Sequence, residues 1–137
     1  MAEHESDYAY TARSGTCKYK QTTSTHVVSY KNVQYRSVTQ LKAAIAQGPT
    51  SVTIEADRSA FQSYTSGILN TAACGTSLDH AVTAVGYGTE GGVLYAIVRN
   101  SWTASWGESG YIRMALKAQG KEGVCGILMD PTTVNTH

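Results

Sequence analysis

The stretch AVTAVGYGTEGGVLYAIVR fills residues 81–99 and contains two strand-like runs on either side of a glycine-rich turn. The runs cover residues 81–87 and 93–99, and a third run of the same kind covers residues 110–115. Their aliphatic and aromatic side chains are typical of strands that pack one face on a core. Strand-like runs joined by short glycine-rich turns predict an antiparallel sheet.

One amphipathic helix and a further strand are expected upstream of these runs. Residues 37–47 have a helical apolar period, and Ser37 and Gln40 have the spacing of a capping box. Residues 52–56 alternate apolar and polar side chains, and residues 59–64 fit one helical turn in which Ser59 opens a second capping box. A helix followed by strands predicts an α+β fold with an antiparallel, barrel-like sheet and one or two short helices at its edge.

Composition excludes several classes of function. The 137 residues carry 11 basic and 10 acidic side chains, so no strong field favours nucleic acid or an anionic membrane. No apolar run reaches the roughly 18 residues that a membrane span needs. The cysteines and histidines show no short ligand spacing, so neither a metal centre nor a cofactor is expected. Three cysteines allow one disulfide with a leftover thiol, or three thiols in a reducing compartment.

Residues 86–91 match the dinucleotide-binding pattern Gly-x-Gly-x-x-Gly. That pattern requires a helix to start at the glycines, so that amide donors face a pyrophosphate. Residues 93–98 continue as a strand-like run instead. We therefore interpret the glycines as a hairpin loop.

His80 and Asn100 are the candidate catalytic pair. His80 stands at the mouth of one predicted strand and Asn100 at the end of another, where side chains are held rigidly and still reach a cleft. An amide oxygen from Asn100 can fix the imidazole ring, and Trp102 can shield that bond from water. Each residue taken alone also fits a structural role. Asp79, next to His80, is expected to point to the opposite face and to be a solvated charge.

Motifs in the same order resemble those of the papain family of cysteine proteases. They are DYAY with SGTC at residues 7–17, GPTSV at 48–52, CGTSLDHAV at 74–82, NSW with WGESGY at 100–111, and GVCG at 123–126. The resemblance runs from Asp7 nearly to the C-terminus. It implies the family's right-hand, barrel-like domain, with residues 1–22 as the crossing segment between domains and residues 23–137 as the C-terminal β-barrel domain.

The same resemblance implies roles for individual residues. His80 is the acid/base, Asn100 orients it and Trp102 covers the pair. A pocket for the substrate's second side chain is lined by Leu78, Ala81 and the neighbourhood of Asp130. The implied disulfide joins Cys74 to Cys125, and Cys17 is half of a bridge whose partner lies in the helical left-hand domain.

The nucleophile of such a protease is not found in these residues. The family motif Cys-Gly-Ser/Ala-Cys-Trp/Tyr stands about 130 to 150 residues before the histidine, whereas 79 residues precede His80. No such motif occurs in the sequence, and neither does the oxyanion-hole glutamine. The helical domain is therefore expected to be absent. Two departures from the family pattern are Thr103, where glycine is usual, and Ala96, where a large aromatic is usual.

Two functions remain open at this point. The chain is either part of a cysteine peptidase that cuts peptides only when another chain supplies the nucleophile, or a pseudoenzyme that serves as an interaction module. Both imply a partner, which is a second polypeptide covering the missing helical-domain face or a larger complex. Descent from an ordinary family precursor implies lysosomal or secreted residence.

Overall fold

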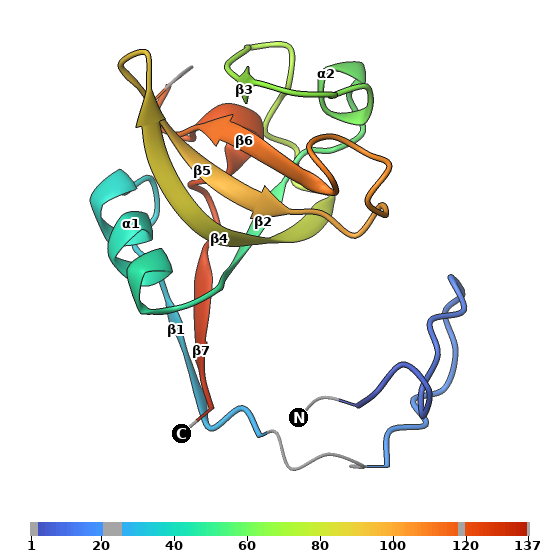
Figure 1. The fold of residues 1–137 in the computed structure, drawn as a ribbon. Coiled ribbons are helices and arrows are strands. Elements are labelled where there is room, and N and C mark those ends of the chain that lie inside the picture. The colour runs from blue at the N-terminus through green and yellow to red at the C-terminus, as the bar shows by residue number, and fades with distance from the viewer. Residues whose placement is uncertain (1–2, 21–25, 118–119, 137) are drawn as a thin grey trace. The chain divides into compact units, whose positions relative to one another are not determined.

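The computed structural model describes residues 3–20, 26–117 and 120–136, and the chain divides into two compact units (Figure 1). The larger unit comprises Lys31–Thr133, and the smaller comprises Met1–Tyr30 with Val134–His137. The boundary expected between residues 22 and 23 lies outside the described residues. The division into a crossing segment and a barrel domain therefore stays a prediction.

Seven strands form one sheet in the part of the chain that the structure describes. In spatial order they are β1 (Ser29–Asn32), β7 (Thr132–Asn135), β2 (Thr50–Ile54), β4 (His80–Glu90), β5 (Val93–Arg99), β6 (Tyr111–Ala115) and β3 (Ile68–Leu69). The pairs β7–β2, β2–β4, β4–β5 and β5–β6 are antiparallel, whereas β3 pairs with β6 in parallel. The predicted α+β fold is confirmed, and the short β3 makes its sheet mixed rather than wholly antiparallel.

The long hairpin of β4 and β5 turns more tightly than the sequence predicts. β4 continues through Gly86 and Gly88 to Glu90, which pairs with Val93. The turn itself is Gly91-Gly92, with φ of +56° and +78°, the left-handed conformation that glycine adopts at no steric cost. The expected loop at residues 86–91 was therefore wrong in its extent. The glycines do not open a helix, so the dinucleotide-binding interpretation has no structural basis.

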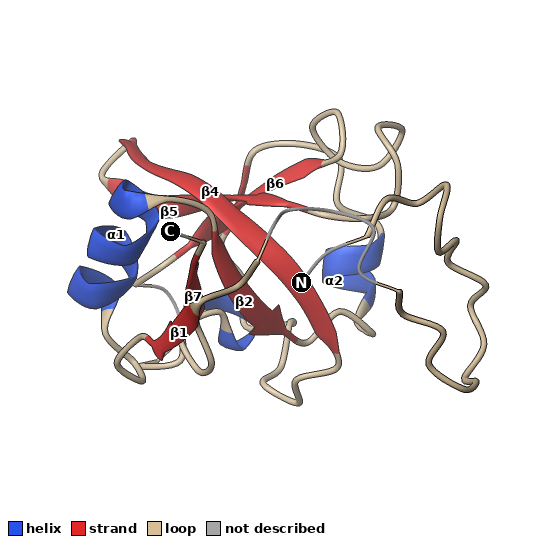
Figure 2. Ribbon diagram, turned by 90° about the horizontal axis from the view of Figure 1, so that it is seen from below, coloured by secondary structure: helices blue, strands red, loops and turns tan. Residues whose placement is uncertain are grey.

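Helix α1 (Val38–Gln47) has the boundaries and the buried face that its sequence predicts. The Ser37 side chain accepts a hydrogen bond from the Gln40 backbone N–H at 3.2 Å, which satisfies one free donor of the first turn. Leu41, Ala44 and Ile45 are buried. Figure 2 shows α1 and α2 near opposite ends of the long strand β4.

Helix α2 (Ser59–Gln62) begins where expected, but without the predicted cap. Arg58 occupies the N-cap position, and no side chain bonds the free amides of the first turn. The Ser59 capping box was therefore wrong. Burial of Phe61 stabilises this single turn instead.

One hydrophobic core fills the larger unit. Side chains from α1, α2, the central strands and the 3₁₀ turn η1 (Val124–Gly126) meet there, and the largest fully buried apolar ones are Phe61, Leu41, Ile54, Ile112, Met114, Leu116, Ile127, Leu128, Val52, Val98 and Val124. Along β2 the buried residues alternate with more exposed ones, so one face of that strand packs on the core. This packing gives β2 and β4 the rigidity needed to hold a site at their ends.

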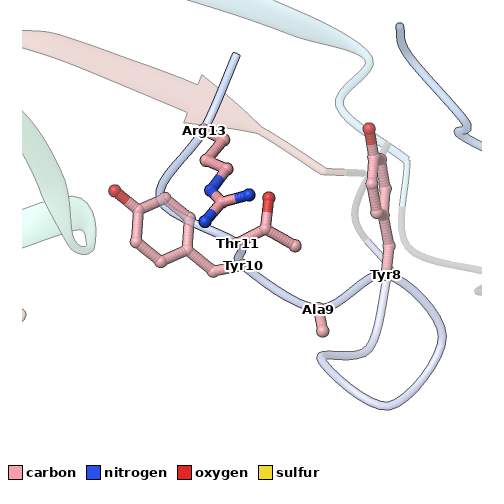
Figure 3. Close-up of a pocket in the computed structure, with 5 residues that line it drawn as sticks. All are labelled: Tyr8, Ala9, Tyr10, Thr11 and Arg13. Atoms are coloured by element: carbon pink, nitrogen blue, oxygen red, sulfur yellow. The ribbon is translucent and has the colours of Figure 1, made fainter. Parts of the chain in front are cut away.

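The smaller unit is irregular over residues 3–20 and exposed over residues 4–20. Side chains within the segment accept hydrogen bonds from its own backbone amides. The Tyr10 N–H donates to the Glu5 carboxylate at 2.8 Å, and the Lys18 N–H donates to the Tyr8 hydroxyl at 3.2 Å. An open pocket in this unit is lined by Tyr8, Ala9, Tyr10, Thr11 and Arg13 (Figure 3). The segment is thus ordered locally by its own polar side chains.

Candidate active site

His80 is the first residue of β4, and the backbone at this strand end is paired with β2. Its register partner is Ile54 at the end of β2. The residue before it, Asp79, donates its backbone N–H to the Ile54 carbonyl at 3.0 Å. The half-buried imidazole therefore projects from a strand end whose path is fixed by the sheet.

The His80 Nε2 atom lies 2.9 Å from the Asn100 Oδ1 atom. The same Oδ1 accepts a hydrogen bond from the Ser101 backbone N–H at 2.8 Å. Since only an oxygen can accept from that amide, this second bond assigns which end of the Asn100 side chain faces His80. Nε2 must then carry the proton that it donates to Asn100, and Nδ1 is the ring atom left for proton exchange.

Asn100 is held by its backbone as well as by its side chain. It follows the last residue of β5, and its N–H donates to the Gly110 carbonyl at 3.0 Å. The residue is buried, and its Nδ2 has no hydrogen-bond partner among the described residues. Burying an amide that is bonded through its oxygen alone costs stability.

Aromatic side chains surround the imidazole. The Trp102 ring centroid lies 5.3 Å from that of His80, with the ring planes 34° apart. Phe61 packs edge-on against Trp102 at 5.4 Å and lies 6.3 Å from His80, and Trp106 lies 5.5 Å from Trp102. The structure thus brings together the three residues expected at the site, and adds Phe61 and Trp106, which sequence reasoning did not assign to it.

Thr103 adopts the backbone conformation that glycine usually supplies at its position. Its φ is +70°, a value that β-branched residues rarely adopt. Its hydroxyl lies 2.8 Å from the Ser105 hydroxyl. The turn after Trp102 therefore keeps a left-handed shape despite the threonine, at a cost in strain.

The three residues expected to line the substrate pocket come from the loop before β4, from β4 itself and from the segment after η1. Leu78 is half-buried against Gly126, where an added Cβ would lie 2.9 Å from its Cδ2 atom. Ala81 is exposed on β4 opposite Thr53 of β2, and Asp130 is exposed after η1. No hydrogen bond or ion pair in the described part of the chain joins Asp130 to the other two, so this pocket stays a prediction.

Asp79 does more than carry a solvated charge. Its residue is exposed, as expected, but Oδ1 accepts a hydrogen bond from the Ala56 backbone N–H at 2.7 Å. The carboxylate is therefore exposed as expected, and it also joins the loop before β4 to the chain leaving β2. No hydrogen bond joins its carboxylate to His80 in the described structure.

A buried carboxylate that sequence reasoning missed lies close to this loop. Glu55 is 1% exposed and accepts hydrogen bonds from the Ser77 backbone N–H at 2.5 Å and from Arg58 Nε at 2.6 Å. The amide of Ser77 and then the guanidinium of Arg58 lower the Glu55 pKa below its ordinary value. In the sequence, Glu55 is one polar residue in a strand of alternating polar and apolar residues. Only its burial in the structure distinguishes it from an ordinary exposed glutamate.

The cysteines fall into two classes. A disulfide joins Cys74 to Cys125 within the larger unit, which is the pairing that the resemblance implies. Cys17, in the smaller unit, is free and exposed. In the described residues no group of three or more histidine, cysteine or acidic side chains is placed to hold a metal ion, and no helix there has the length and apolarity to cross a membrane.

Residues 1–135 match the family pattern described as papain family cysteine protease. The chain belongs to the papain family. The germination-specific cysteine protease 1 of Arabidopsis thaliana is 50% identical over 129 residues, and the oryzain beta chain of Oryza sativa subsp. japonica is 47% identical over 128 residues. These alignments cover 92% and 91% of this chain.

The papain-family chain also matches solved structures. Bromelain protease from Ananas comosus, solved with an inhibitor, superposes with a TM-score of 0.85 at 41% identity over 97% of this chain. The chain spans 62% of that bromelain chain, 34% of the Arabidopsis relative and 27% of oryzain beta. It therefore corresponds to one part of a papain-family protease.

Proposed function

We propose that this chain carries the acid/base and orienting residues of a papain-type peptidase site, and that peptide-bond hydrolysis requires a nucleophile from outside these 137 residues. The observation that carries the proposal is the bond of 2.9 Å between His80 Nε2 and Asn100 Oδ1. It leaves Nδ1 as the proton-transfer atom. Trp102, packed on the imidazole, covers the bond and excludes water from it.

The proposed chemistry assigns one step to each group. A thiolate from outside these residues attacks the peptide carbonyl, and the imidazolium of His80 protonates the departing amine through Nδ1 as the C–N bond breaks. The neutral imidazole then takes a proton from the water that cleaves the thioester, and the thiolate is restored. Asn100 keeps the ring in one orientation throughout both steps.

The cysteines of this chain support an external source for the nucleophile. Cys74 and Cys125 are joined in a disulfide, so neither has a thiol to ionise. Cys17 is exposed in the smaller unit and lies outside any nucleophile motif. We therefore expect the isolated chain to be inactive on peptides.

Complementation tests the proposal directly. The chain is mixed with the helical part of a papain-family protease that carries the nucleophilic cysteine, and an irreversible thiol-directed probe reports whether that cysteine is activated. Labelling and hydrolysis are expected in the mixture and in neither part alone. A matched mixture with His80→Ala should form the same complex and remain unlabelled. A correctly formed complex with no labelling would contradict the proposal.

A second candidate is a pseudoenzyme that serves as an interaction module. Exposed aromatic and aliphatic side chains in the smaller unit favour it, namely Tyr8, Tyr10, Tyr19, Val27, Val28, Tyr30 and Val134. Exposed apolar side chains contact a partner where they form one continuous patch, and the partner proposed here is a second polypeptide on the missing helical-domain face or a larger complex. Size measurement by light scattering and pull-down of the tagged chain test this function. A soluble monomer that captures no partner would count against it.

A further inference from the structure

The buried Glu55 carboxylate lies directly beyond the end of β2 and binds the loop that leads to His80. One of its oxygens, Oε2, accepts the Ser77 backbone N–H at 2.5 Å, and Ser77 stands three residues before His80. The other, Oε1, accepts from Arg58 Nε at 2.6 Å. Arg58 is largely exposed whereas Glu55 is not, so the ion pair anchors the carboxylate from its solvent side.

The loop is shaped around this carboxylate. A Cβ added to Gly75 would lie 2.3 Å from Glu55 Oε2 and 2.9 Å from its Cδ atom. No other residue type fits so close to the carboxylate without displacing it. The Glu55 backbone is fixed in turn, because its N–H donates to the Cys125 carbonyl at 2.9 Å. The loop with Ser77 thus rests on an acceptor that cannot easily move.

Further bonds join the same two segments immediately before His80. The Ala56 N–H donates to Asp79 Oδ1 at 2.7 Å, and the Asp79 N–H donates to the Ile54 carbonyl at 3.0 Å. Ile54 is also the register partner of His80. Residues 54–56 therefore hold residues 77–80 by backbone and side-chain bonds, and the bond from Ser77 to Glu55 is the one furthest from His80 along the chain.

We propose that Glu55 is a positioning residue for His80: its buried carboxylate fixes the loop at residues 75–77 and thereby sets the imidazole at its distance from Asn100. An apolar side chain would fill the same volume without the cost of burying a charge, and such replacements are often neutral or stabilising. It would leave the Ser77 amide without its acceptor. The assignment rests on the proposed function, because that function gives His80 its acid/base role.

The test uses the isolated chain, and its readout needs no hydrolysis. Proton–nitrogen NMR follows two signals, the exchange rate of the Ser77 amide and the Nε2–H resonance of His80, which is identified by its loss in His80→Gln. In Glu55→Ala we expect Ser77 to exchange about ten- to a hundredfold faster, as loss of a bond to a buried charged acceptor implies. The Nε2–H resonance should broaden or disappear.

Two more variants keep the test decisive if Glu55→Ala folds poorly. Glu55→Gln retains an oxygen that can accept from Ser77, and it should restore the His80 resonance. Gly75→Ala keeps the charge but pushes a methyl group against Oε2, and it should reproduce the Ser77 and His80 changes of Glu55→Ala. Ile45→Ala in α1 is the stability control, because it removes core packing near the other end of β4.

The positioning role requires that the His80 signal change when the loop at residues 75–77 is altered, and not whenever the chain is destabilised. Ile45→Ala should lower the unfolding temperature and leave both NMR signals in place. An unchanged Nε2–H resonance in folded Glu55→Ala or Gly75→Ala would overturn the assignment, as would loss of the resonance in Ile45→Ala. Failure of complementation would affect only the proposed peptidase function, since these signals are read without a partner.

Discussion

The amide oxygen of Asn100 bonds two groups at once, the His80 Nε2 atom at 2.9 Å and the Ser101 backbone N–H at 2.8 Å. The second bond fixes the orientation of the amide, and the first passes that orientation to the imidazole. The pair comes from the start of β4 and from the residue that follows β5, neighbouring strands with fixed register. Two neighbouring strands therefore carry the pair, and the loop that leads to His80 is itself bonded to the residues at the end of β2.

Asn100→Ala should free the imidazole without unfolding the chain. The variant removes the acceptor of Nε2–H, so the ring can rotate and exchange tautomers. In the complemented protease we expect the turnover number to fall roughly a hundredfold, within the range attributed to oriented acid–base groups. Circular dichroism checks the fold, and probe labelling with peptide hydrolysis gives the activity. A variant that keeps full turnover would show that Asn100 does not orient His80.

Sequence patterns predicted the helices and strands in which many neighbouring residues favour the same secondary structure. Helix α1 has a cap and an apolar face, and the runs of β4, β5 and β6 are long enough to be recognised. His80 and Asn100 were placed at strand ends by the same reasoning. Such signals are local, so they survive without knowledge of the tertiary structure.

The missed features depend on contacts between distant segments. β1, β3 and β7 have two to four residues each and lack a buried alternation, so pairing alone defines them. Glu55 is buried because residues 74–77 fold over it, and no pattern near position 55 reports that. The hydrogen bond of Asp79 was not predicted, because it depends on the Ala56 amide, 23 residues away in the chain.

Thr103→Gly should stabilise the larger unit. The threonine holds φ at +70°, and glycine removes that strain while making the unfolded chain more flexible. The expected net gain is about 0.5–1 kcal/mol in the free energy of unfolding. Urea denaturation measures it, with Thr103→Ala as the control that keeps the unfavourable φ and loses the hydroxyl. Equal stability of the glycine and alanine variants would mean that the turn stores no strain.

Replacing both Cys74 and Cys125 with serine should strongly destabilise the chain. Their bridge closes a loop with a sequence separation of 51 residues. Closing a loop of this length lowers the entropy of the unfolded chain and adds about 4 kcal/mol to the free energy of unfolding. The free energy of unfolding from urea titration measures the loss. Cys17→Ser is the matched control, and since Cys17 is exposed and unbridged it should change stability by less than about 0.5 kcal/mol. A reductant should destabilise the parent and not the double variant.

Acid should remove a share of stability that belongs to Glu55. Its folded pKa lies below the ordinary value of 4.5, chiefly because the Ser77 amide and Arg58 bond the ionised form. In the acidic range the unfolded chain therefore binds the proton more readily. The contribution is complete above pH 4.5 and is lost as pH falls through the lowered folded pKa.

Glu55→Gln cannot titrate, so its unfolding temperature should fall less steeply than that of the parent between about pH 5 and about pH 2.5. Glu108 supplies the comparison, because Arg113 and the Gly67 amide also lower its pKa. Glu108→Gln should also reduce the fall of the unfolding temperature with pH, and the variant with both changes should show a smaller fall than either single variant. If Glu55→Gln follows the parent curve in parallel, the Glu55 pKa is the same in the folded and the unfolded chain, and the bond to Ser77 does not favour the ionised carboxylate.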